Sequence, residues 1–128
     1  MNYQETLDYL DSLIRSGIKL GLDNTARLLD ALGNPQLKVS TIHIAGTNGK
    51  GSTAIFAESI LRAAGFRTGL YTSPHLLDFR ERIQVNRLNI SPEDLAPLAT
   101  RVRSVCEQNQ INATYFEFGT VLAFLYFF

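Results

Sequence analysis

The residues best suited to chemistry lie in a glycine-rich segment, Gly46 to Ser52, which reads Gly-Thr-Asn-Gly-Lys-Gly-Ser. Glycines let a backbone turn tightly and bring its N–H groups against phosphate oxygens, and Lys50 adds a positive charge. An apolar run from Val39 to Ile44 precedes the segment, and a helical pattern follows it. Strand, glycine-rich turn and helix is the order of a phosphate-binding cradle. The segment therefore predicts a nucleoside triphosphate site.

The segment departs from the commonest phosphate-binding pattern, G-x-x-x-x-G-K-[ST]. Gly49 and Lys50 fit the end of that pattern, but Gly51 stands in place of the Ser or Thr, and Ile44 stands in place of the first glycine. On spacing alone, an ordinary glycine-rich turn between a strand and a helix is the alternative interpretation.

Length, charge and cysteine content limit the classes of protein to which the chain can belong. The chain has 128 residues, the length of one domain or part of one, and 45% of them are apolar. Twelve basic residues balance twelve acidic ones, which argues against a nucleic-acid surface. Cys106 is the only cysteine, so no internal disulfide forms and a reducing, cytoplasmic setting is expected. No signal peptide is visible at the N-terminus.

The last eight residues, Val121 to Phe128, are all apolar. A membrane span needs about 20 residues, so we expect a core helix that is cut off mid-element and no membrane insertion. The chain is accordingly expected to be truncated.

Periodicity predicts an α/β fold, a mostly parallel sheet flanked by helices. Residues 39–44 read as a central strand, and a helix followed by a strand at 67–72 would complete a right-handed βαβ unit. Cys106 falls on the apolar stripe of a late helix, which favours a core thiol over a reactive one. The other expected elements are helices over 3–14, 23–32, 51–64, a stretch from 92 to about 106 and one from 114, and short strands over 82–85 and 88–90 about a turn at Asn86-Arg87. Asp23 is expected to cap the second helix, and Thr114 with Glu117 is a possible capping box for the last one. Phe56 and Ile60 are expected on the apolar face of the helix over 51–64.

Beyond these patterns, five blocks resemble the folylpolyglutamate synthase and dihydrofolate synthase family of the Mur ligase superfamily. They occur in the family's order and are Gly17–Leu22, Gly46–Ser52, Tyr71–Leu76, Glu81–Ile83 and Thr114–Phe118. The resemblance implies that residues 1–128 are the N-terminal part of a P-loop-type central ATPase domain. The rest of that domain and a C-terminal glutamate-binding domain are then absent.

The resemblance also implies an ATP-dependent ligase that adds glutamate to a folate. A folate or dihydropteroate carboxylate attacks the γ-phosphate of ATP, and the amine of L-glutamate then attacks the resulting acyl phosphate. Lys50 is the expected catalytic residue, because the protein must neutralise phosphate charge. Ser73, by resemblance, and Ser52 are the expected Mg²⁺ ligands, with a simple turn serine as the alternative for Ser73. The expected ATP-binding residues are Gly46, Thr47, Asn48, Gly49, Lys50, Gly51 and Ser52.

The expected folate contacts fall in three blocks. They are Lys19, Leu20, Gly21, His75, Thr114, Tyr115, Phe116 and Glu117. An aromatic ring and a carboxylate suit a flat pterin. A solvated loop histidine is the alternative for His75, core packing for Phe116 and helix capping for Glu117. His43 is expected to pack within the fold, without a catalytic role.

Two other functions compete with this interpretation. One is a Mur-type ligase acting on a cell-wall precursor, and the other is a non-catalytic nucleotide-binding fragment that works with a partner. We expect the 128-residue chain alone to be inactive and the full-length enzyme to be a cytoplasmic monomer that contacts neither nucleic acid nor membrane.

Overall fold

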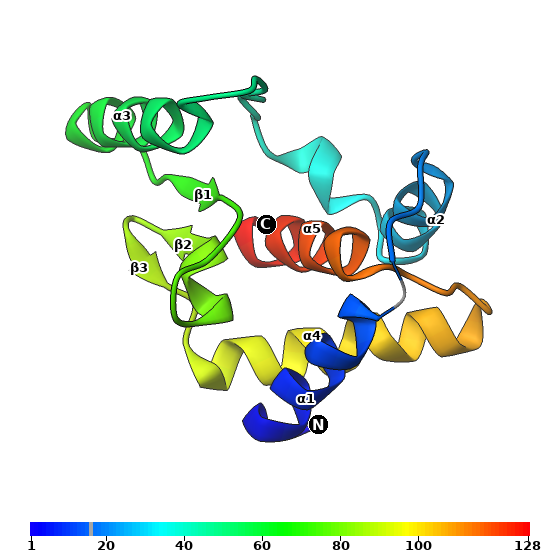
Figure 1. Ribbon diagram of the computed structural model, residues 1–128. Coiled ribbons are helices and arrows are strands. Elements are labelled where there is room, and N and C mark those ends of the chain that lie inside the picture. Colours follow the sequence, from blue (N-terminus) through cyan, green and yellow to red (C-terminus); the bar gives the residue numbers. More distant parts are fainter. Residues whose placement is uncertain (16) are drawn as a thin grey trace. The chain divides into compact units, whose positions relative to one another are not determined.

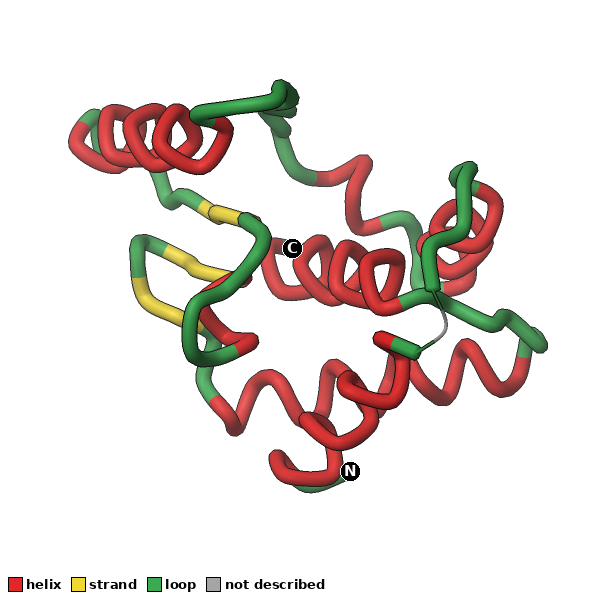
Figure 2. Tube along the Cα trace, viewed as in Figure 1, coloured by secondary structure: helices red, strands yellow, loops and turns green. Residues whose placement is uncertain are grey.

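The computed structural model describes residues 1–15 and 17–128. The chain divides into two compact units. Residues 1–39 and 92–128 form a helical unit, and residues 40–91 form a unit with a small sheet. The element types are distinguished by colour in Figure 2.

The helical unit is built around its last helix. Its elements are α1 (Tyr3–Ile14), α2 (Asp23–Ala31), the 3-10 helix η1 (Pro35–Lys38), α4 (Pro92–Gln108) and α5 (Tyr115–Phe127) (Figure 1). Helix α5 is apolar nearly all round and packs against α1, α2, α4 and η1. A helix with that pattern is stable only when it is covered on all sides, which accounts for its central place in the unit.

Side chains at the helix starts explain where the helices begin. The predicted capping box of Thr114 and Glu117 is confirmed at the start of α5, and Asn2 with Glu5 forms another at α1. The prediction that Asp23 caps the second helix is wrong. Asp23 is instead the first residue of α2. There its carboxylate interacts favourably with the positive end of the helix dipole.

Buried aliphatic and aromatic side chains form the core of this unit. Tyr9 and Phe118 meet edge to face with ring centroids 5.3 Å apart. Cys106 is buried, and burial raises the pKa of its thiol to about 11, so the prediction of an inert core thiol is confirmed. The largest fully buried apolar side chains here are Leu10, Leu28, Leu95, Val102, Phe118, Val121 and Leu122.

The second unit consists of one helix and a three-stranded sheet. Its elements are α3 (Lys50–Ala63), β1 (Gly69–Tyr71), the 3-10 helix η2 (Phe79–Arg82), β2 (Ile83–Val85) and β3 (Leu88–Asn89). The strand order is β1-β2-β3 and both pairings are antiparallel, with Tyr71 opposite Ile83 and Val85 opposite Leu88. The predicted turn between β2 and β3 is confirmed. Its central residues, Asn86 and Arg87, have φ of 48° and 67°, as tight hairpins require.

The α/β class is confirmed, but the expected parallel pairing is not observed in the described residues. Residues 40–46 form no strand, and β1 pairs with β2 in antiparallel fashion, so no βαβ unit is present in residues 40–91. The run has the apolar, β-branched composition of a strand. Composition alone does not hold a strand, because its backbone groups need a ladder partner, and no described segment provides one.

Helix α3 shows the consequence of the missing strand. Phe56 and Ile60, expected on a packed face, are 68% and 69% exposed. His43, expected to pack in the fold, is exposed as well. In the part of the chain that the structure describes, no helix is long and apolar enough to cross a bilayer.

Candidate functional site

The glycine-rich segment leads directly into helix α3. Gly49 is the residue before the helix and has φ of 76°, a value that L side chains rarely adopt. A Cβ at Gly49 would meet no atom within 4 Å, so backbone conformation rather than space demands a glycine there. Gly51 lies inside α3, and a Cβ there would also meet no atom within 4 Å. The two glycines therefore have different physical roles.

Lys50 is the first residue of α3, and its side chain folds back over the loop. Its Nζ donates to the carbonyl oxygen of Gly46 at 2.7 Å and to that of Thr47 at 3.5 Å. The ammonium thus lies against the loop backbone, where phosphate oxygens would approach it.

The start of α3 offers backbone donors beside that ammonium. No side chain caps the helix. Among the described residues, the N–H groups of Lys50, Gly51 and Ser52 have no recorded acceptor. Uncapped N–H groups at a helix start carry partial positive charge and bind anions. A charged lysine beside a row of N–H donors is the arrangement expected of a cradle for an anion.

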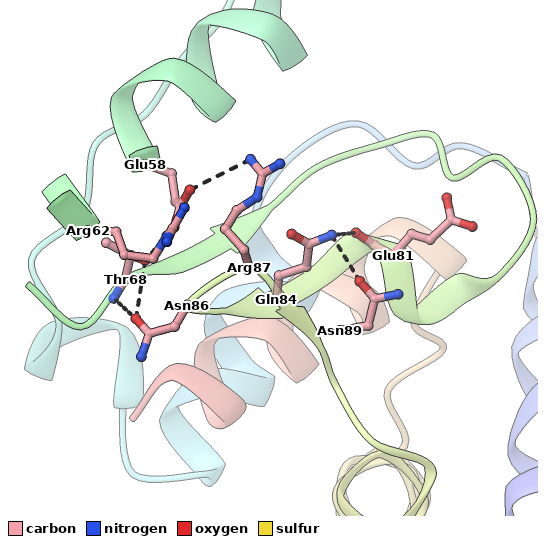
Figure 3. Close-up of polar contacts among 8 residues, drawn as sticks. All are labelled: Glu58, Arg62, Thr68, Glu81, Gln84, Asn86, Arg87 and Asn89. Carbon is pink, nitrogen blue, oxygen red and sulfur yellow. Dashed lines mark hydrogen bonds and ion pairs between the residues drawn. The ribbon is translucent and has the colours of Figure 1, made fainter. Parts of the chain in front are cut away.

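A buried carboxylate anchors α3 to the sheet (Figure 3). Glu58 has only 3% of its side chain exposed, and its Oε1 accepts from Thr68 Oγ1 at 2.7 Å and from Arg62 Nε at 3.0 Å. Its Oε2 lies 3.6 Å from Nη1 of Arg87 in the β2–β3 turn. Asn86 of the same turn accepts from the backbone N–H of Thr68 at 3.0 Å. A carboxylate buried to this degree needs such partners, and they tie the helix to the start of β1 and to the adjacent β2–β3 turn.

The anchoring brings two candidate segments to one end of the unit. Helix α3 packs on β1, and the two run in opposite directions in Figure 1. The start of α3, which carries the cradle, therefore lies at the same end as the end of β1, which leads to Ser73. No hydrogen bond joins Ser52 to Ser73 in the described residues, so the two expected metal ligands share an end of the unit without touching.

The segment after β1 is organised by Glu81 of η2. One carboxylate accepts from three consecutive backbone N–H groups, those of Leu76 at 2.9 Å, Leu77 at 2.9 Å and Asp78 at 2.8 Å. These bonds hold the pKa of Glu81 below its usual range. Leu77 is 94% exposed, so hydrophobic packing does not fix this backbone. The carboxylate does.

Arg82 and Phe79 contact His75 in the same segment. Arg82 Nε lies 2.7 Å from His75 Nδ1, and the Phe79 ring lies edge-on to the imidazole with centroids 6.4 Å apart. Arg80 pairs with Asp78 at 2.7 Å. Desolvation opposes ionisation of Asp78, but the hydrogen bonds and charge of Arg80 outweigh it, and the pKa of Asp78 is lowered.

Mg²⁺ prefers hard oxygen ligands and commonly takes one or two from the protein while phosphates and water supply the rest. The described residues contain no cluster of three or more His, Cys, Asp or Glu side chains suited to a metal. Ser52 and Ser73 are exposed hydroxyls at one end of the sheet unit. They fit a cation that arrives with a nucleotide, and they do not form a complete protein cage.

The expected folate segments lie in the helical unit, and Asn24 of α2 joins them. Its Oδ1 accepts from Lys19 Nζ at 3.5 Å, and its Nδ2 donates to Glu117 Oε2 at 3.2 Å and to the Asn112 carbonyl at 3.0 Å. Thr114 N–H also donates to Glu117 Oε2, at 2.8 Å. The carboxylate is buried and its capping role is confirmed.

Exposed apolar groups accompany these segments. Leu20 and Phe116 are both exposed, so neither side chain serves as core packing. Tyr115 lies beside Phe116 in the first turn of α5 and is partly exposed. Among the eight expected contacts, His75 alone belongs to the other unit.

Sequence reasoning missed Asn24 and the roles of Glu58, Glu81 and Arg82. Each acts on a partner that is several or many residues away. The only local signal was the i,i+4 spacing of Glu58 and Arg62, which also occurs on solvated helix faces.

Comparisons with known proteins lead to the same family that the five sequence blocks resemble. A dihydrofolate synthase/folylpolyglutamate synthase of Bacillus subtilis is 39% identical over 129 residues, covering 98% of this chain and 30% of that protein. The solved folylpolyglutamate synthetase from Lactobacillus casei superposes with a TM-score of 0.91 at 41% identity, covering 99% of this chain and 33% of that one. A solved complex of such a synthase with AMPPCP and folate gives a TM-score of 0.87 at 40% identity, covering 99% and 32%.

This chain belongs to the folylpolyglutamate synthase and dihydrofolate synthase family. The resemblance and the fold class predicted from the sequence are thereby confirmed. No family model matches the sequence, so membership rests on these relatives and structures. The chain spans about a third of the length of the family members it matches.

Proposed function

We propose that this chain supplies the nucleotide-phosphate cradle of an ATP-dependent ligase that joins L-glutamate to a folate or dihydropteroate. One observation carries the proposal. Lys50, whose ammonium lies against the carbonyl oxygen of Gly46, is the first residue of a helix whose first N–H groups no side chain caps. A solved relative in complex with AMPPCP and folate supports the choice of reactants.

The proposed reaction has two steps. A carboxylate oxygen of the folate attacks the γ-phosphorus of ATP, the bond from that phosphorus to the bridging oxygen breaks, and ADP leaves. The amine of glutamate then attacks the acyl carbon of the acyl phosphate, loses a proton and expels phosphate. The protein positions the reactants and neutralises charge.

Each candidate residue has a stated part in this proposal. Lys50 binds the transferring phosphoryl group, and the N–H groups of the loop hold the neighbouring phosphates. The hydroxyls of Ser52 and Ser73 would hold Mg²⁺, which offsets charge on the phosphates when it is bound. Phe116 and Leu20 offer exposed apolar surface for a pterin ring.

The further features of the full protein belong to the proposal as well. We place it in the cytoplasm, because its single cysteine is a buried free thiol. We also propose that it acts as a monomer without nucleic acid.

Calorimetric titration of the 128-residue chain with AMPPCP and Mg²⁺ tests the cradle. We expect binding, and we expect Lys50→Ala to weaken it about 10- to 100-fold, because hydrogen bonds to charged groups contribute roughly 1.5–3 kcal/mol. Lys38→Ala is the matched control, since Lys38 lies 4.4 Å above the Phe128 ring in the helical unit. Equal affinity for all three proteins would refute the role of Lys50.

Activity assays address the two rival functions. We expect the chain alone to bind nucleotide without folate-dependent release of ADP, which is also the behaviour of a non-catalytic nucleotide-binding fragment. A preference for a cell-wall precursor over folate would favour another Mur-type ligase.

A further inference from the structure

Asn48 and Gly49 form the only Asn-Gly pair in the chain. The side-chain carbonyl of an asparagine can be attacked by the backbone nitrogen of the next residue, and a following glycine permits this best because it has no Cβ to block the approach. The pair lies inside the glycine-rich segment, immediately before Lys50 and helix α3. The sequence thus places the asparagine most prone to this reaction within the proposed phosphate cradle.

The fold restrains neither of the two reacting groups. Asn48 is exposed, and in the part of the chain that the structure describes its side chain has no recorded hydrogen bond. The backbone N–H of Gly49 has no recorded acceptor in the same residues, and a Cβ at Gly49 would meet no atom within 4 Å. Residues 47–49 belong to neither helix nor strand. The side-chain amide of Asn48 is therefore able to approach the nitrogen of Gly49.

Two other asparagines in turns are protected from the same reaction. Asn34 precedes Pro35, whose ring nitrogen carries no proton and cannot attack. Asn86 lies in the β2–β3 turn, where its Oδ1 accepts from the backbone N–H of Thr68 at 3.0 Å, and this bond fixes the side chain. Asn48 has neither form of protection, so we expect it to react first.

We propose that Asn48 is a deamidation site whose reaction ends nucleotide binding, and that bound nucleotide protects it. The nitrogen of Gly49 bonds to Cγ of Asn48, the bond from Cγ to Nδ2 breaks, and the proton of the Gly49 nitrogen leaves with Nδ2 as ammonia. Water then opens the five-membered imide. Addition of water at Cγ gives aspartate, and addition at the backbone carbonyl carbon gives isoaspartate, whose main chain runs through Cβ and Cγ.

Either product is unfavourable for a bound triphosphate. Aspartate adds a negative charge two residues before Lys50, where the phosphates would lie, and like charges repel strongly at close range. Isoaspartate adds the same charge and also lengthens the main chain, which displaces the N–H groups at the start of α3. The loss of binding rests on the proposed function, whereas the reaction itself rests on the sequence, the exposure and the unrestrained side chain alone.

Bound nucleotide should slow the reaction. In the proposed cradle the N–H groups of the loop donate to phosphate oxygens, and a backbone nitrogen held in this way does not attack Asn48. At a nucleotide concentration about 100 times the Kd, only about 1% of the chain is free to react, so deamidation should be about 100-fold slower.

Ageing the 128-residue chain at physiological temperature and pH, with and without AMPPCP and Mg²⁺, tests the reaction. Peptide mass spectrometry measures aspartate and isoaspartate at residue 48, with Asn34 and Asn86 as internal references. We expect Asn48 to be converted first without nucleotide and to be protected with it. Conversion of Asn48 no faster than that of Asn34 would overturn the assignment, and equal conversion with and without saturating AMPPCP would overturn the protective role.

Two variants connect deamidation to binding. Calorimetric titration of fresh Asn48→Asp should give an affinity for AMPPCP about 10- to 100-fold weaker than that of the fresh unmodified chain. Asn48→Gln is the matched control, because its longer side chain would have to close a six-membered ring and should not cyclise. Its affinity should be the same before and after ageing, while that of the unmodified chain falls.

The outcomes separate the inference from the proposed function. An Asn48→Asp variant that binds AMPPCP as tightly as the unmodified chain would refute the effect on binding, and so would an Asn48→Gln variant that loses affinity on ageing as fast as the unmodified chain. Absence of AMPPCP binding by the fresh chain would refute the proposed function and with it the effect on binding. A stable Asn48 in a chain that binds AMPPCP would refute the inference alone.

Discussion

Removal of the Glu58 carboxylate should loosen the attachment of α3 to the sheet. Glu58→Ala takes the acceptor from Thr68 and Arg62 and the counter-charge from Arg87. Hydrogen bonds to a charged group contribute about 1.5–3 kcal/mol. Arg62 and Arg87 have 44% and 36% of their side chains exposed, so both regain water and neither is left as a buried unpaired charge. The net loss of stability is therefore about 2–3 kcal/mol.

Amide hydrogen exchange on the 128-residue chain measures this loss where it occurs. A loss of about 2 kcal/mol corresponds to about 30-fold faster exchange, expected for the amides of α3 and β1. Glu58→Gln keeps the shape and one acceptor oxygen, and should lose roughly half as much.

The chain provides a matched control with the same spacing on an exposed helix face. Arg103 and Glu107 pair at 2.8 Å on α4, and the Glu107 side chain is 62% exposed. Exposed pairs of this kind contribute about 0.3–0.5 kcal/mol, so Glu107→Ala should change exchange by less than threefold. If Glu58→Ala also accelerates α3 and β1 exchange by less than threefold, Glu58 does not anchor the helix.

Two further predictions concern the loops at the candidate site. Gly49→Ala should lower the free energy of unfolding by about 1–2 kcal/mol, because an L residue is strained at φ of 76°. Gly51→Ala inside α3 should not lower it. Thermal unfolding measures both variants, and equal losses at the two positions would contradict the argument. Glu81 has a lowered folded pKa, so its bonds to the amides of Leu76 and Leu77 should be complete above its ordinary pKa of 4.5 and be lost as pH falls through the lower folded value. Amide chemical shifts between pH 7 and 3 check this, and a transition centred at or above pH 4.5 would refute it.

Elements with strong local signals were predictable from the sequence. Tyr3–Ile14 was predicted to the residue, and the capping box at Thr114 and the turn at Asn86 have the expected geometry. Each depends on side chains within a few residues of one another. The strand expected over 39–44 does not form, because a strand depends on a partner that lies far away in the sequence. Its apolar run satisfies the composition of a strand, but a strand also needs a ladder partner from a distant segment, and β-propensity carries no information on that partner.

The same division runs through the candidate site. Glycines and a lysine at fixed spacing were visible because a phosphate cradle is built from consecutive residues, and the loop indeed turns at Gly49 and folds Lys50 over its own backbone. The residues that hold such a cradle in place are different in kind. A carboxylate such as Glu58 looks like half of an ordinary surface pair in the sequence, and only its burial against Thr68 and Arg87 shows it to be an anchor. Positioning residues act through distant backbone and side-chain partners, so the structure is needed to find them, and their removal should disturb geometry before it disturbs ligand contacts.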